Sequence, residues 1–516
     1  MTLTLSPEQL AIAKYVEDGR DNVLVVARAG TGKTFLIRVC LPLMRGPVAV
    51  LAYNNKIAKE IESKVRADNG RADVGTFHSF GNRLLRRALP KAKLEGRNAK
   101  DEAGYYKADR IIEELKVPEY LKGFVRRAMD LGMQRGFGVV SPLNNPSMWL
   151  DLVQHYDIDS DLADDNIAVQ MRGREQVIRE GCQFSAKGVK LGITIAHEVF
   201  SFADMLYLPL VLNARFPQYG FVAVDEAQDS NPVRREMAAR MVRPGGRMFF
   251  VGDPKQSING WCGADNDAMD RIGGDFRCRR FAMTVTFRCA KAVVELVKPI
   301  VPDYRAAEAN PPGVVRCVSE EQFYKDEAHR LVPSDAIICR NTKPLVVMAY
   351  RLLGRGVACH VEGKDIGKDL VKVVDRFPGV KSVSVLADRL ADYLSRRMDK
   401  LMRDKKEAQA EALSDRVETV LAIIEGLPKG SDVEAVRRQI ASLFADSRSG
   451  EKRQTVTLLT AHKSKGLEFE RVFGLGVAKL FPSRFARQPW MLEQESCLEY
   501  VLKTRAITEY VDIMVP

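Results

Sequence analysis

Short apolar runs that end at polar or glycine-containing segments recur along this chain, and they set its expected architecture. Three of them, 22–26 (NVLVV), 221–224 (FVAV) and 248–251 (MFFV), have the length and composition of strands buried in a parallel sheet. The first run leads through a glycine-containing turn into 34–40, which we predict as a helix that stops at Pro42. Buried strands alternating with helices indicate an α/β fold.

Two long stretches between these runs are charged and have helical spacing. The first spans about 88–198 and the second about 368–452. In the second, apolar residues recur at intervals of four, four, four and three positions: Leu386, Leu390, Leu394, Met398 and Leu401. We interpret this stripe as ordinary helix packing that serves as scaffold, and both stretches as mainly helical inserts.

The length of the chain indicates several domains, and its net charge is compatible with a polyanionic partner. A chain of 516 residues is too long for one ordinary core, so roughly two to four domains are expected. Lys and Arg number 79 against 67 Asp and Glu, and the net charge of +12 fits a polyanion without requiring one. Part of the basic excess lies in residues 83–100. A solvated surface explains the charge of this segment as well as a polyanionic partner does.

Cysteine usage and the lack of long apolar runs favour a cytoplasmic protein. Nine cysteines are scattered without a C-x-x-C pair, so neither a zinc site nor a disulfide framework is expected. No apolar run reaches the length that spans a membrane, and MTLTLSPEQ lacks the basic and apolar regions of a secretory signal.

The segment 25–35 (VVARAGTGKTF) nearly matches the phosphate-loop pattern G-x-x-x-x-G-K-[ST], except that Ala27 stands where the first glycine belongs. A strand, a glycine turn and a helix would direct backbone N–H groups at an anion. Lys33 would then reach the β- and γ-phosphates of a nucleotide, and the Thr34 hydroxyl would hold Mg²⁺. From this stretch alone, a chance GKT sequence in a glycine-rich turn is the alternative.

Candidate catalytic groups follow the other two runs. Asp225 and Glu226 come directly after the second run, and acids at the carboxyl end of a parallel strand face the crevice where ligands bind. Asp225 is placed to hold Mg²⁺ and Glu226 to polarise the attacking water. After the third run, Gln256 is a candidate contact to the γ-phosphate, and Trp261 lies in a polar loop bounded by glycines. Taken alone, these segments also fit a surface turn and a buried ring.

In their residues and in their order along the chain, these segments resemble those of the UvrD/Rep-type superfamily 1 DNA helicases. The phosphate loop of that family usually reads A-x-A-G-[ST]-G-K-T, so Ala27 is the family's own choice. VDEAQD at 224–229 is verbatim, and VTLLTAHKSKGLEFERVF at 456–473 is the most specific downstream match. Further matches are LSPEQ (5–9), LAYNNKIAKEI (51–61), GTFHSF (75–80), FADML (202–206), VTFRCA (285–290), 335–363 and EYVLKTRA (499–506).

The resemblance implies roles for individual residues. ATP and Mg²⁺ would bind between two motor cores. Besides Lys33, Thr34, Asp225, Glu226 and Gln256, the nucleotide site would contain Gln9 as the adenine reader, the loop residues Ala29, Gly30, Thr31 and Gly32, Phe287 stacked on adenine, Glu468 at the ribose, and Arg288 and Arg505 as arginine fingers. Single-stranded DNA would contact Tyr53, Asn55, Thr76, Phe77, His78 and Trp261 in the first core and His462 in the second.

The resemblance also implies the domain order. The first RecA-like core would comprise 1–87 and 199–280 around an insert at 88–198. The second would comprise 281–367 and 453–516 around a smaller insert at 368–452. The sequence continues for eleven residues after Arg505, so we expect a compact form without a C-terminal extension or nuclease domain.

Departures from the family are confined to a few positions. Cys40 and Cys262 each replace a usual arginine, and Ser496 and Cys497 replace two. They bear on the fine tuning of DNA and nucleotide contacts rather than on ATP hydrolysis itself.

The implied function is an ATP-dependent DNA helicase or translocase that moves 3′ to 5′ on single-stranded DNA and acts at single/double-strand junctions, with a protein partner possible. Three alternatives stay open: an ATP-gated DNA-sensing subunit of a larger DNA-processing or defence complex, an RNA-directed motor, and a P-loop enzyme unrelated to nucleic acid.

Overall fold

The chain forms two compact units, each built on a parallel β-sheet. The first contains the residues up to Ala27 and Gly32–Met283, and the second contains Arg28–Thr31 and the chain from Thr284 onward. The computed structural model describes residues 5–52, 58–59, 61–63, 72–95, 106–156, 158, 162, 167–258, 267–403, 407–428, 430–445, 454–486 and 488–515. Every pairing of named strands is parallel, which confirms the α/β fold class.

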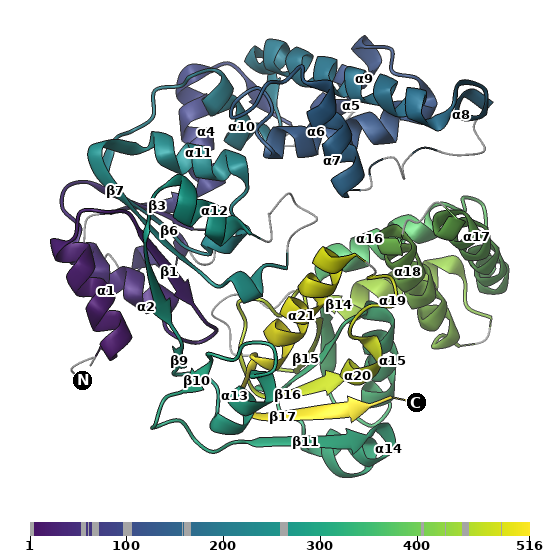
Figure 1. Cartoon of the computed structure of the whole chain (residues 1–516). Coiled ribbons are helices and arrows are strands. Elements are labelled where there is room, and N and C mark those ends of the chain that lie inside the picture. Colours follow the sequence, from purple (N-terminus) through teal and green to yellow (C-terminus); the bar gives the residue numbers. More distant parts are fainter. Residues whose placement is uncertain are drawn as a thin grey trace. The chain divides into compact units, whose positions relative to one another are not determined.

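The first unit contains a six-stranded sheet in the order β3-β2-β6-β7-β1-β8 (Figure 1). Its strands are β1 (Val23–Ala27), β2 (Val48–Ala52), β3 (Ala72–Thr76), β6 (Tyr219–Val224), β7 (Val242–Gly252) and β8 (Arg279–Met283). The three apolar runs form β1, β6 and the end of β7. They are apolar throughout because helices cover both faces of the sheet.

Different helices cover the two faces. Helices α1 (Pro7–Asp18) and α2 (Lys33–Cys40) pack with Val23, Val25 and their neighbours on one face. The other face packs with α4 (Phe77–Ala88), α10 (Asp204–Val211), α11 (Pro232–Arg240) and α12 (Ala268–Asp275). The carboxyl ends of the strands therefore lie between two helical layers.

The helical insert of the first unit starts and ends at a short parallel ladder. Strands β4 (Lys93–Leu94) and β5 (Val199–Phe200) pair with each other and flank the insert. Between them lie α5 (Lys107–Glu114), α6 (Lys122–Gln134), α7 (Pro146–Tyr156), α8 (Ile167–Arg172) and α9 (Arg174–Thr194). Buried side chains of the insert, including Phe124 and Trp149, join the same hydrophobic cluster as Phe80 and Leu206. The insert is thus packed onto the core rather than attached only by its ends.

The second unit contains a seven-stranded sheet in the order β11-β17-β16-β12-β15-β13-β14. Its strands are β11 (Val314–Ser319), β12 (Ala336–Cys339), β13 (Cys359–Glu362), β14 (Phe444–Ala445), β15 (Val456–Thr460), β16 (Phe469–Leu475) and β17 (Ala506–Met514). Its helices outside the insert include α13 (Lys291–Val297), α14 (Glu320–Gln322), α15 (Thr342–Leu353), α20 (Val477–Leu480) and α21 (Pro489–Lys503). A two-stranded ladder, β9 (Val285–Thr286) with β10 (Arg305–Ala306), lies apart from this sheet.

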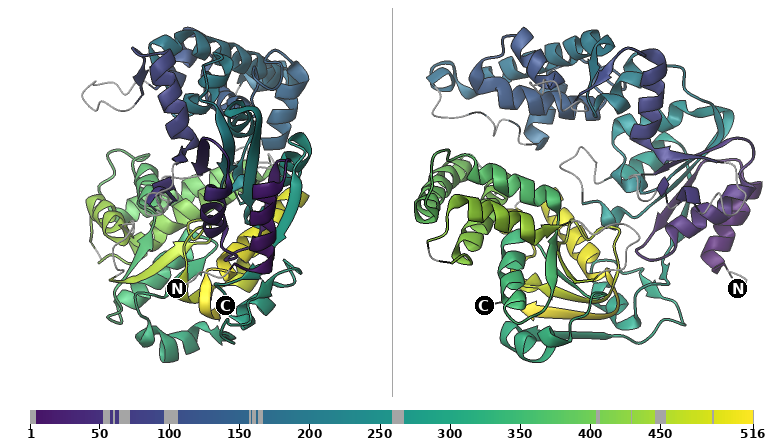
Figure 2. Two further views of the ribbon diagram at one scale, coloured as in Figure 1. Left: turned by 90° about the vertical axis from the view of Figure 1, so that its left-hand side faces the viewer. Right: turned by 180° about the vertical axis from the view of Figure 1, so that it is seen from behind.

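Within the described residues, the second insert consists of helices drawn in green in Figures 1 and 2. They are α16 (Lys364–Val374), α17 (Val383–Arg403), α18 (Glu407–Glu425) and α19 (Val433–Leu443). The apolar stripe predicted from the sequence lies on α17, where Leu386 and Leu390 are fully buried and Leu401 nearly so. Its interpretation as helix packing is confirmed.

The longest helices described, α9 and α17, have 21 residues each. Across the part of the chain that the structure describes, no helix combines the length and the apolar character needed to cross a membrane.

Candidate nucleotide-binding site

The phosphate-loop segment leads from the end of β1 into α2. Ala27 is the last residue of β1, is fully buried, and pairs with Met283 of β8. It is part of an extended strand, so its position does not need the freedom of glycine. Gly30 and Gly32 do, because their φ values of 68° and 87° lie in the left-handed region.

The N-terminus of α2 is arranged to receive an anion. Its N-cap residue is Gly32, which has no side chain to accept hydrogen bonds from the first turn. The N–H groups of that turn, which includes Lys33 and Thr34, therefore depend on another acceptor, and a phosphate is well suited. Oγ1 of Thr31 donates to the Arg28 carbonyl at 2.9 Å and closes the turn before the helix.

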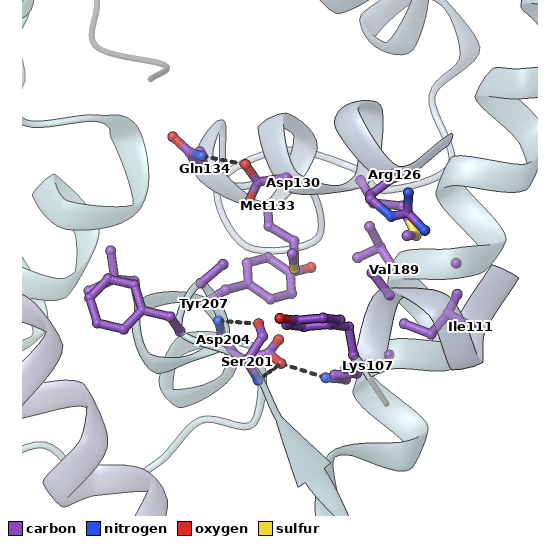
Figure 3. Close-up of a pocket in the computed structure, with 18 of the residues that line it drawn as sticks. Lys107, Ile111, Arg126, Asp130, Met133, Gln134, Val189, Ser201, Asp204 and Tyr207 are labelled. Carbon is purple, nitrogen blue, oxygen red and sulfur yellow. Dashed lines mark hydrogen bonds and ion pairs between the residues drawn. The ribbon is translucent and has the colours of Figure 1, made fainter. Parts of the chain in front are cut away.

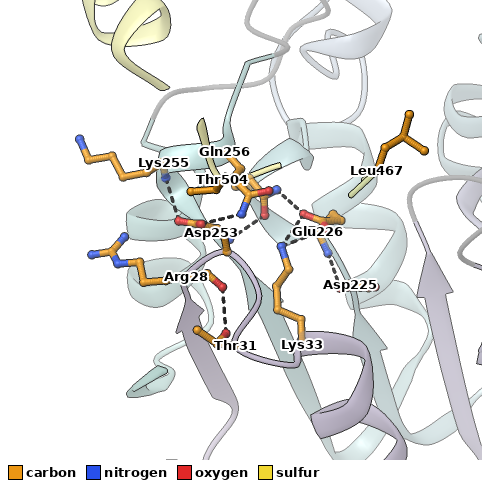
Figure 4. Close-up of polar contacts among 12 residues, drawn as sticks. Arg28, Thr31, Lys33, Asp225, Glu226, Asp253, Lys255, Gln256, Leu467 and Thr504 are labelled. Atoms are coloured by element: carbon orange, nitrogen blue, oxygen red, sulfur yellow. Dashed lines mark hydrogen bonds and ion pairs between the residues drawn. The ribbon is translucent and has the colours of Figure 1, made fainter. Parts of the chain in front are cut away.

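Lys33 and Glu226 form an ion pair at this edge of the first sheet (Figure 4). The Nζ atom of Lys33 lies 2.9 Å from Oε1 of Glu226, and the two side chains are only 12% and 15% exposed. Burial by itself would lower the pKa of Lys33, but Glu226, Asp253 and Asp225 outweigh it and raise the pKa above its usual value. Lys33 is therefore a fixed positive charge surrounded by carboxylates.

Glu226 sits in a strained turn directly after β6. Its φ of 51° and ψ of 45° are left-handed, which costs a residue with a Cβ about 1–3 kcal/mol. Its N–H donates to Oδ1 of Asp225 at 2.9 Å, and the N–H of Asp225 donates to the Leu51 carbonyl at 3.0 Å. This turn holds the two neighbouring carboxylates at the carboxyl end of the sheet.

The residues expected to bind a metal ion suit Mg²⁺ bound together with a nucleotide. The Asp225 carboxylate and the Thr34 hydroxyl are hard oxygen ligands, and Mg²⁺ commonly takes one or two protein oxygens and completes its shell with phosphate and water. No group of three or more His, Cys, Asp or Glu side chains within the described ranges is arranged to hold a metal ion.

The loop after β7 holds Gln256 near these carboxylates. The Nε2 atom of Gln256 donates to Oδ2 of Asp253 at 2.7 Å, and the Lys255 N–H donates to Oδ1 at 3.1 Å. Asp253 is fully buried and caps the short 3₁₀ turn Pro254–Gln256. Because β6 and β7 are neighbouring parallel strands, their carboxyl ends bring Asp225 and Asp253 to the same edge of the sheet.

Gln9 lies in the first turn of α1 against the phosphate loop. It forms a capping box with Ser6, whose N–H donates to Oε1 of Gln9 at 3.0 Å while Oγ accepts the Gln9 N–H at 3.2 Å. A Cβ added to Gly32 would lie 3.1 Å from Nε2 of Gln9. The residue expected to read adenine is therefore rigidly placed beside the loop.

Residues Arg28–Thr31, at the tip of the loop, pack within the second unit. The Ala29 N–H donates to Oη of Tyr500 at 2.9 Å, and its carbonyl accepts from Oη of Tyr304 at 2.8 Å. The two tyrosine rings meet edge to face with centroids 6.0 Å apart. Neither contact could be predicted from the sequence, because a single tyrosine carries no spacing pattern.

Three residues expected around the nucleotide are neighbours in the second unit. Nε of Arg288 lies 2.8 Å from Oε2 of Glu468, and these side chains are 25% and 56% exposed. Phe287 is 51% exposed, so its ring has a face available for stacking. Its N–H donates to the Gly30 carbonyl at 2.9 Å, and a Cβ on Gly30 would lie 2.6 Å from Cβ of Arg288. Glycine is therefore needed at position 30 for space as well as for backbone conformation.

Arg505 is buried in the second unit. It is 1% exposed, and its Nε and Nη1 atoms donate to the carbonyls of Val501 at 2.8 Å and Leu467 at 3.0 Å. Nη2 donates to Oγ1 of Thr504 at 3.1 Å. Burial and the neighbouring Arg288 lower the pKa of Arg505 to about 10, so it stays charged at neutral pH. The expected second finger is thus a cation held firmly by backbone carbonyls.

Two residues expected to contact DNA at the start of α4 have structural roles. Thr76 caps α4 by accepting the Ser79 N–H at 3.1 Å. Phe77 is 3% exposed and packs in the core of the first unit. The expectation that Phe77 stacks on a base is wrong, because a ring buried in the core has no face to offer.

His78, the next residue, is placed differently. Its ring stacks on Phe202 with centroids 3.8 Å apart and an interplanar angle of 15°. Burial and Arg234 lower its pKa to about 4, so it is neutral at physiological pH. Phe202 is 60% exposed, and the pair presents an aromatic surface that the sequence pattern alone did not single out.

The other residues expected to contact DNA are only partly covered by the structure. Tyr53, Asn55 and Trp261 lie outside the described residues, and their expected roles stay predictions. His462 follows β15 in the second unit and is exposed.

A cavity of about 1070 Å³ lies in the first unit between the core helices and the insert (Figure 3). At this cavity, Nζ of Lys107 lies 2.7 Å from Oδ2 of Asp204, and both side chains are at most 4% exposed. Asp204 also accepts the Ser201 N–H at 2.7 Å. This buried ion pair connects α5 of the insert to α10 of the core.

Comparisons with known proteins agree with this geometry. The family profile described as the UvrD/REP helicase N-terminal domain matches residues 5–136 and 193–277, and the UvrD-like helicase C-terminal domain matches 378–511. A probable DNA helicase II homolog of Mycoplasma pneumoniae is 24% identical over 339 residues, covering 60% of this chain and 43% of that protein.

Two further relatives are also named as DNA helicases. An ATP-dependent DNA helicase PcrA of Staphylococcus epidermidis is 23% identical over 353 residues, covering 60% of this chain and 43% of its own. DNA helicase II of Escherichia coli is 26% identical over 282 residues, covering 50% and 35%. The chain thus spans less than half the length of these curated relatives.

Proposed function

Because this chain belongs to the UvrD/Rep-like family of superfamily 1 helicases, we propose that it is an ATP-dependent DNA helicase or translocase. It hydrolyses ATP and moves on single-stranded DNA in the 3′ to 5′ direction. Its substrates are single strands and single/double-strand junctions.

One observation carries the proposal. The partly buried Lys33–Glu226 ion pair lies beside Asp225 at the carboxyl edge of a parallel sheet, next to a helix N-terminus that begins at a glycine. This combination supplies an anion site, a fixed cation, a metal-binding carboxylate and a second carboxylate for water. Phosphoryl transfer requires these groups together.

In the first unit, ATP is held by the loop and α2, with Mg²⁺ on Thr34 and Asp225. Mg²⁺ neutralises phosphate charge when bound. Lys33 contacts the β- and γ-phosphates, Gln9 reads the adenine, and Gln256 contacts the γ-phosphate. Glu226 orients and deprotonates the attacking water.

The second unit contributes the remaining groups of the nucleotide site. Phe287 stacks on adenine, Glu468 contacts the ribose, and Arg288 and Arg505 neutralise the charge that develops on the phosphoryl group. The Arg288–Glu468 contact supports this assignment, because it joins two of these residues in one place.

Movement on DNA depends on stacking platforms, which read any base. We assign stacking to Tyr53, Trp261 and His78 in the first core and to His462 in the second, and a further DNA contact to Asn55. The exposed aromatic surface of His78 and Phe202 supports the first group. Alternating grip by the two cores converts ATP hydrolysis into stepping.

We further propose the division into four parts at the boundaries stated above: cores at 1–87 with 199–280 and at 281–367 with 453–516, and inserts at 88–198 and 368–452. The β4–β5 ladder at the two ends of the first insert supports the first pair of boundaries.

Displacement of streptavidin from biotinylated single-stranded DNA tests the proposal. Wild-type protein with ATP and Mg²⁺ should displace streptavidin from the 5′ end and not from the 3′ end, because it moves toward the 5′ end. Lys33→Ala is the matched control and should displace neither. Hydrolysis of ATP by the wild type without displacement from either end would contradict the proposed movement.

A further inference from the structure

Gln228 connects the catalytic carboxylate to the neighbouring strand of the first unit. It lies in the 3₁₀ turn Ala227–Asp229 and is fully buried. Its Oε1 accepts the Asp253 N–H at 3.0 Å, and its Nε2 donates to Oε2 of Glu226. A backbone N–H can only donate, so the amide oxygen must face Asp253 and the amide nitrogen must face Glu226.

The backbone of β7 leaves room for this amide because position 252 is glycine. A Cβ on Gly252 would lie 2.5 Å from Oε1 of Gln228 and 3.0 Å from its backbone nitrogen. The φ of Gly252 is not left-handed, so close approach rather than backbone conformation requires glycine here. Any larger side chain would push Gln228 away from its two partners.

The contacts of Glu226 with Lys33 and with Gln228 are of different kinds. Lys33 pairs with its carboxylate across the site, and Gln228 donates to it from two residues along the same turn. If Lys33 contacts phosphate, as proposed, its charge is shared and its hold on Glu226 weakens. The contact with Gln228 is local to the turn and does not depend on Lys33.

We propose that Gln228 is a positioning residue for ATP hydrolysis, which holds the Glu226 carboxylate in the orientation that activates water. Through the Asp253 N–H it also ties Glu226 to the loop whose Gln256 is held by Asp253. The inference rests on the proposed function, because it assumes that Glu226 acts on the attacking water.

Two substitutions at position 228 distinguish the hydrogen bond that the amide oxygen accepts from the one that the amide nitrogen donates. Gln228→Met has a similar volume and loses both hydrogen bonds. Gln228→Glu keeps an acceptor for the Asp253 N–H, but it cannot donate to Glu226 when ionised and sets a second carboxylate against it. Full activity of Gln228→Glu would mean that neither donation to Glu226 nor the charge at position 228 affects hydrolysis.

Two glycine substitutions, a test variant and its control, examine the same role independently. Gly252→Ala should displace the amide without changing it. Gly274→Ala is its matched control, since a Cβ on Gly274 of α12 meets no atom within 4 Å.

The experiment measures kcat and KM for ATP with saturating single-stranded DNA, together with the affinity for a fluorescent ATP analogue and the melting temperature of each nucleotide-free variant. We expect both Gln228 variants to lose kcat by about 10- to 100-fold, as misplacement of a catalytic group does. The analogue's Kd and KM should stay within about threefold of wild type, Gly252→Ala should lose kcat, and Gly274→Ala should match wild type.

Either of two results would overturn the inference: kcat within about threefold of wild type in both Gln228 variants, or full activity of Gln228→Glu alone. If Gln228→Met fails to fold, Gln228→Glu and Gly252→Ala decide the question. A wild-type protein that binds the analogue but hydrolyses no ATP would instead overturn the proposed function itself, and the positioning role with it.

Discussion

At the level of single residues, Lys33 supplies the positive charge at the phosphate loop, 2.9 Å from Glu226. Lys33→Ala should abolish ATP turnover, because it removes the charge that contacts the β- and γ-phosphates. Steady-state hydrolysis with saturating single-stranded DNA is the measurement. Near-normal turnover in this variant would contradict the assignment of the loop as a nucleotide site.

Ala27→Gly is the matched control at the end of β1, directly before the loop. Ala27 lies in a buried strand with an extended backbone, so glycine should cost about 0.5–1 kcal/mol of stability and leave turnover nearly unchanged. A large loss of turnover would show that the Ala27 methyl group does more than fill the end of β1.

The neighbouring carboxylates should differ in what they lose. Glu226→Gln should bind ATP but not hydrolyse it, because an amide cannot deprotonate water. Asp225→Asn should also weaken binding that depends on Mg²⁺, because it removes the charge on a metal ligand. Titration of each variant with a nucleotide analogue, with and without Mg²⁺, separates the two. Identical binding curves for both variants would refute the division of roles.

The chemistry of single residues was more predictable than their surroundings. Motif spacing identified Lys33 and Glu226, which the structure brings together. It could not show that Phe77 faces the core or that Arg505 is enclosed by backbone carbonyls, since both depend on how helices pack. Gln228 lies inside a recognised motif, yet its contact with Asp253 joins the turns that follow β6 and β7, which spacing within the motif does not predict.

At the level of elements, the buried Lys107–Asp204 pair should hold the first insert on its core. Lys107→Met should reduce the free energy of unfolding of the first unit by about 3–5 kcal/mol, because Asp204 is left as a buried, uncompensated charge. Adding Asp204→Asn should restore part of the loss, since asparagine can still accept the Ser201 N–H. Denaturant unfolding of the three variants is the measurement.

The control for this pair is an exposed one on α9. Arg179 and Glu175 form an ion pair at 2.7 Å with side chains 56% and 79% exposed, so Arg179→Met should cost less than about 1 kcal/mol. Equal losses for Lys107→Met and Arg179→Met would mean that burial of the Lys107 pair does not govern its contribution.

The local hydrophobic pattern predicted which segments form helices and strands, but it did not predict which elements lie beside one another. The apolar run 22–26 gave β1 to within one residue, and the stripe on 386–401 gave the buried face of α17. The order β3-β2-β6-β7-β1-β8 was not predicted, because hydrophobicity indicates that a strand is buried and not which strand lies beside it.

For the whole molecule, ATP hydrolysis should need both units. Arg288→Ala and Arg505→Ala should each reduce kcat by about 10³- to 10⁵-fold with a much smaller change in ATP affinity. Single-turnover hydrolysis at saturating ATP is the measurement, and rates within about threefold of wild type for both would mean that the second unit does not act on the nucleotide.

The two arginines should differ in stability. Arg288 is partly exposed and pairs with Glu468, so its loss should leave folding almost unchanged. Arg505→Ala leaves buried carbonyls of Val501 and Leu467 without their donor and should lower the melting temperature. Equal melting temperatures would argue against the buried position of Arg505.

The measurement that tests the central claim most directly is the rate of ATP hydrolysis by the purified chain without nucleic acid, with single-stranded DNA, and with RNA of the same length and sequence. A DNA-directed motor should hydrolyse ATP slowly alone, many times faster with DNA, and little faster with RNA, and Lys33→Ala should be inactive in all three conditions. A wild-type rate that is the same with and without DNA, or that rises only with RNA, would contradict the claim that this protein is a DNA-directed motor.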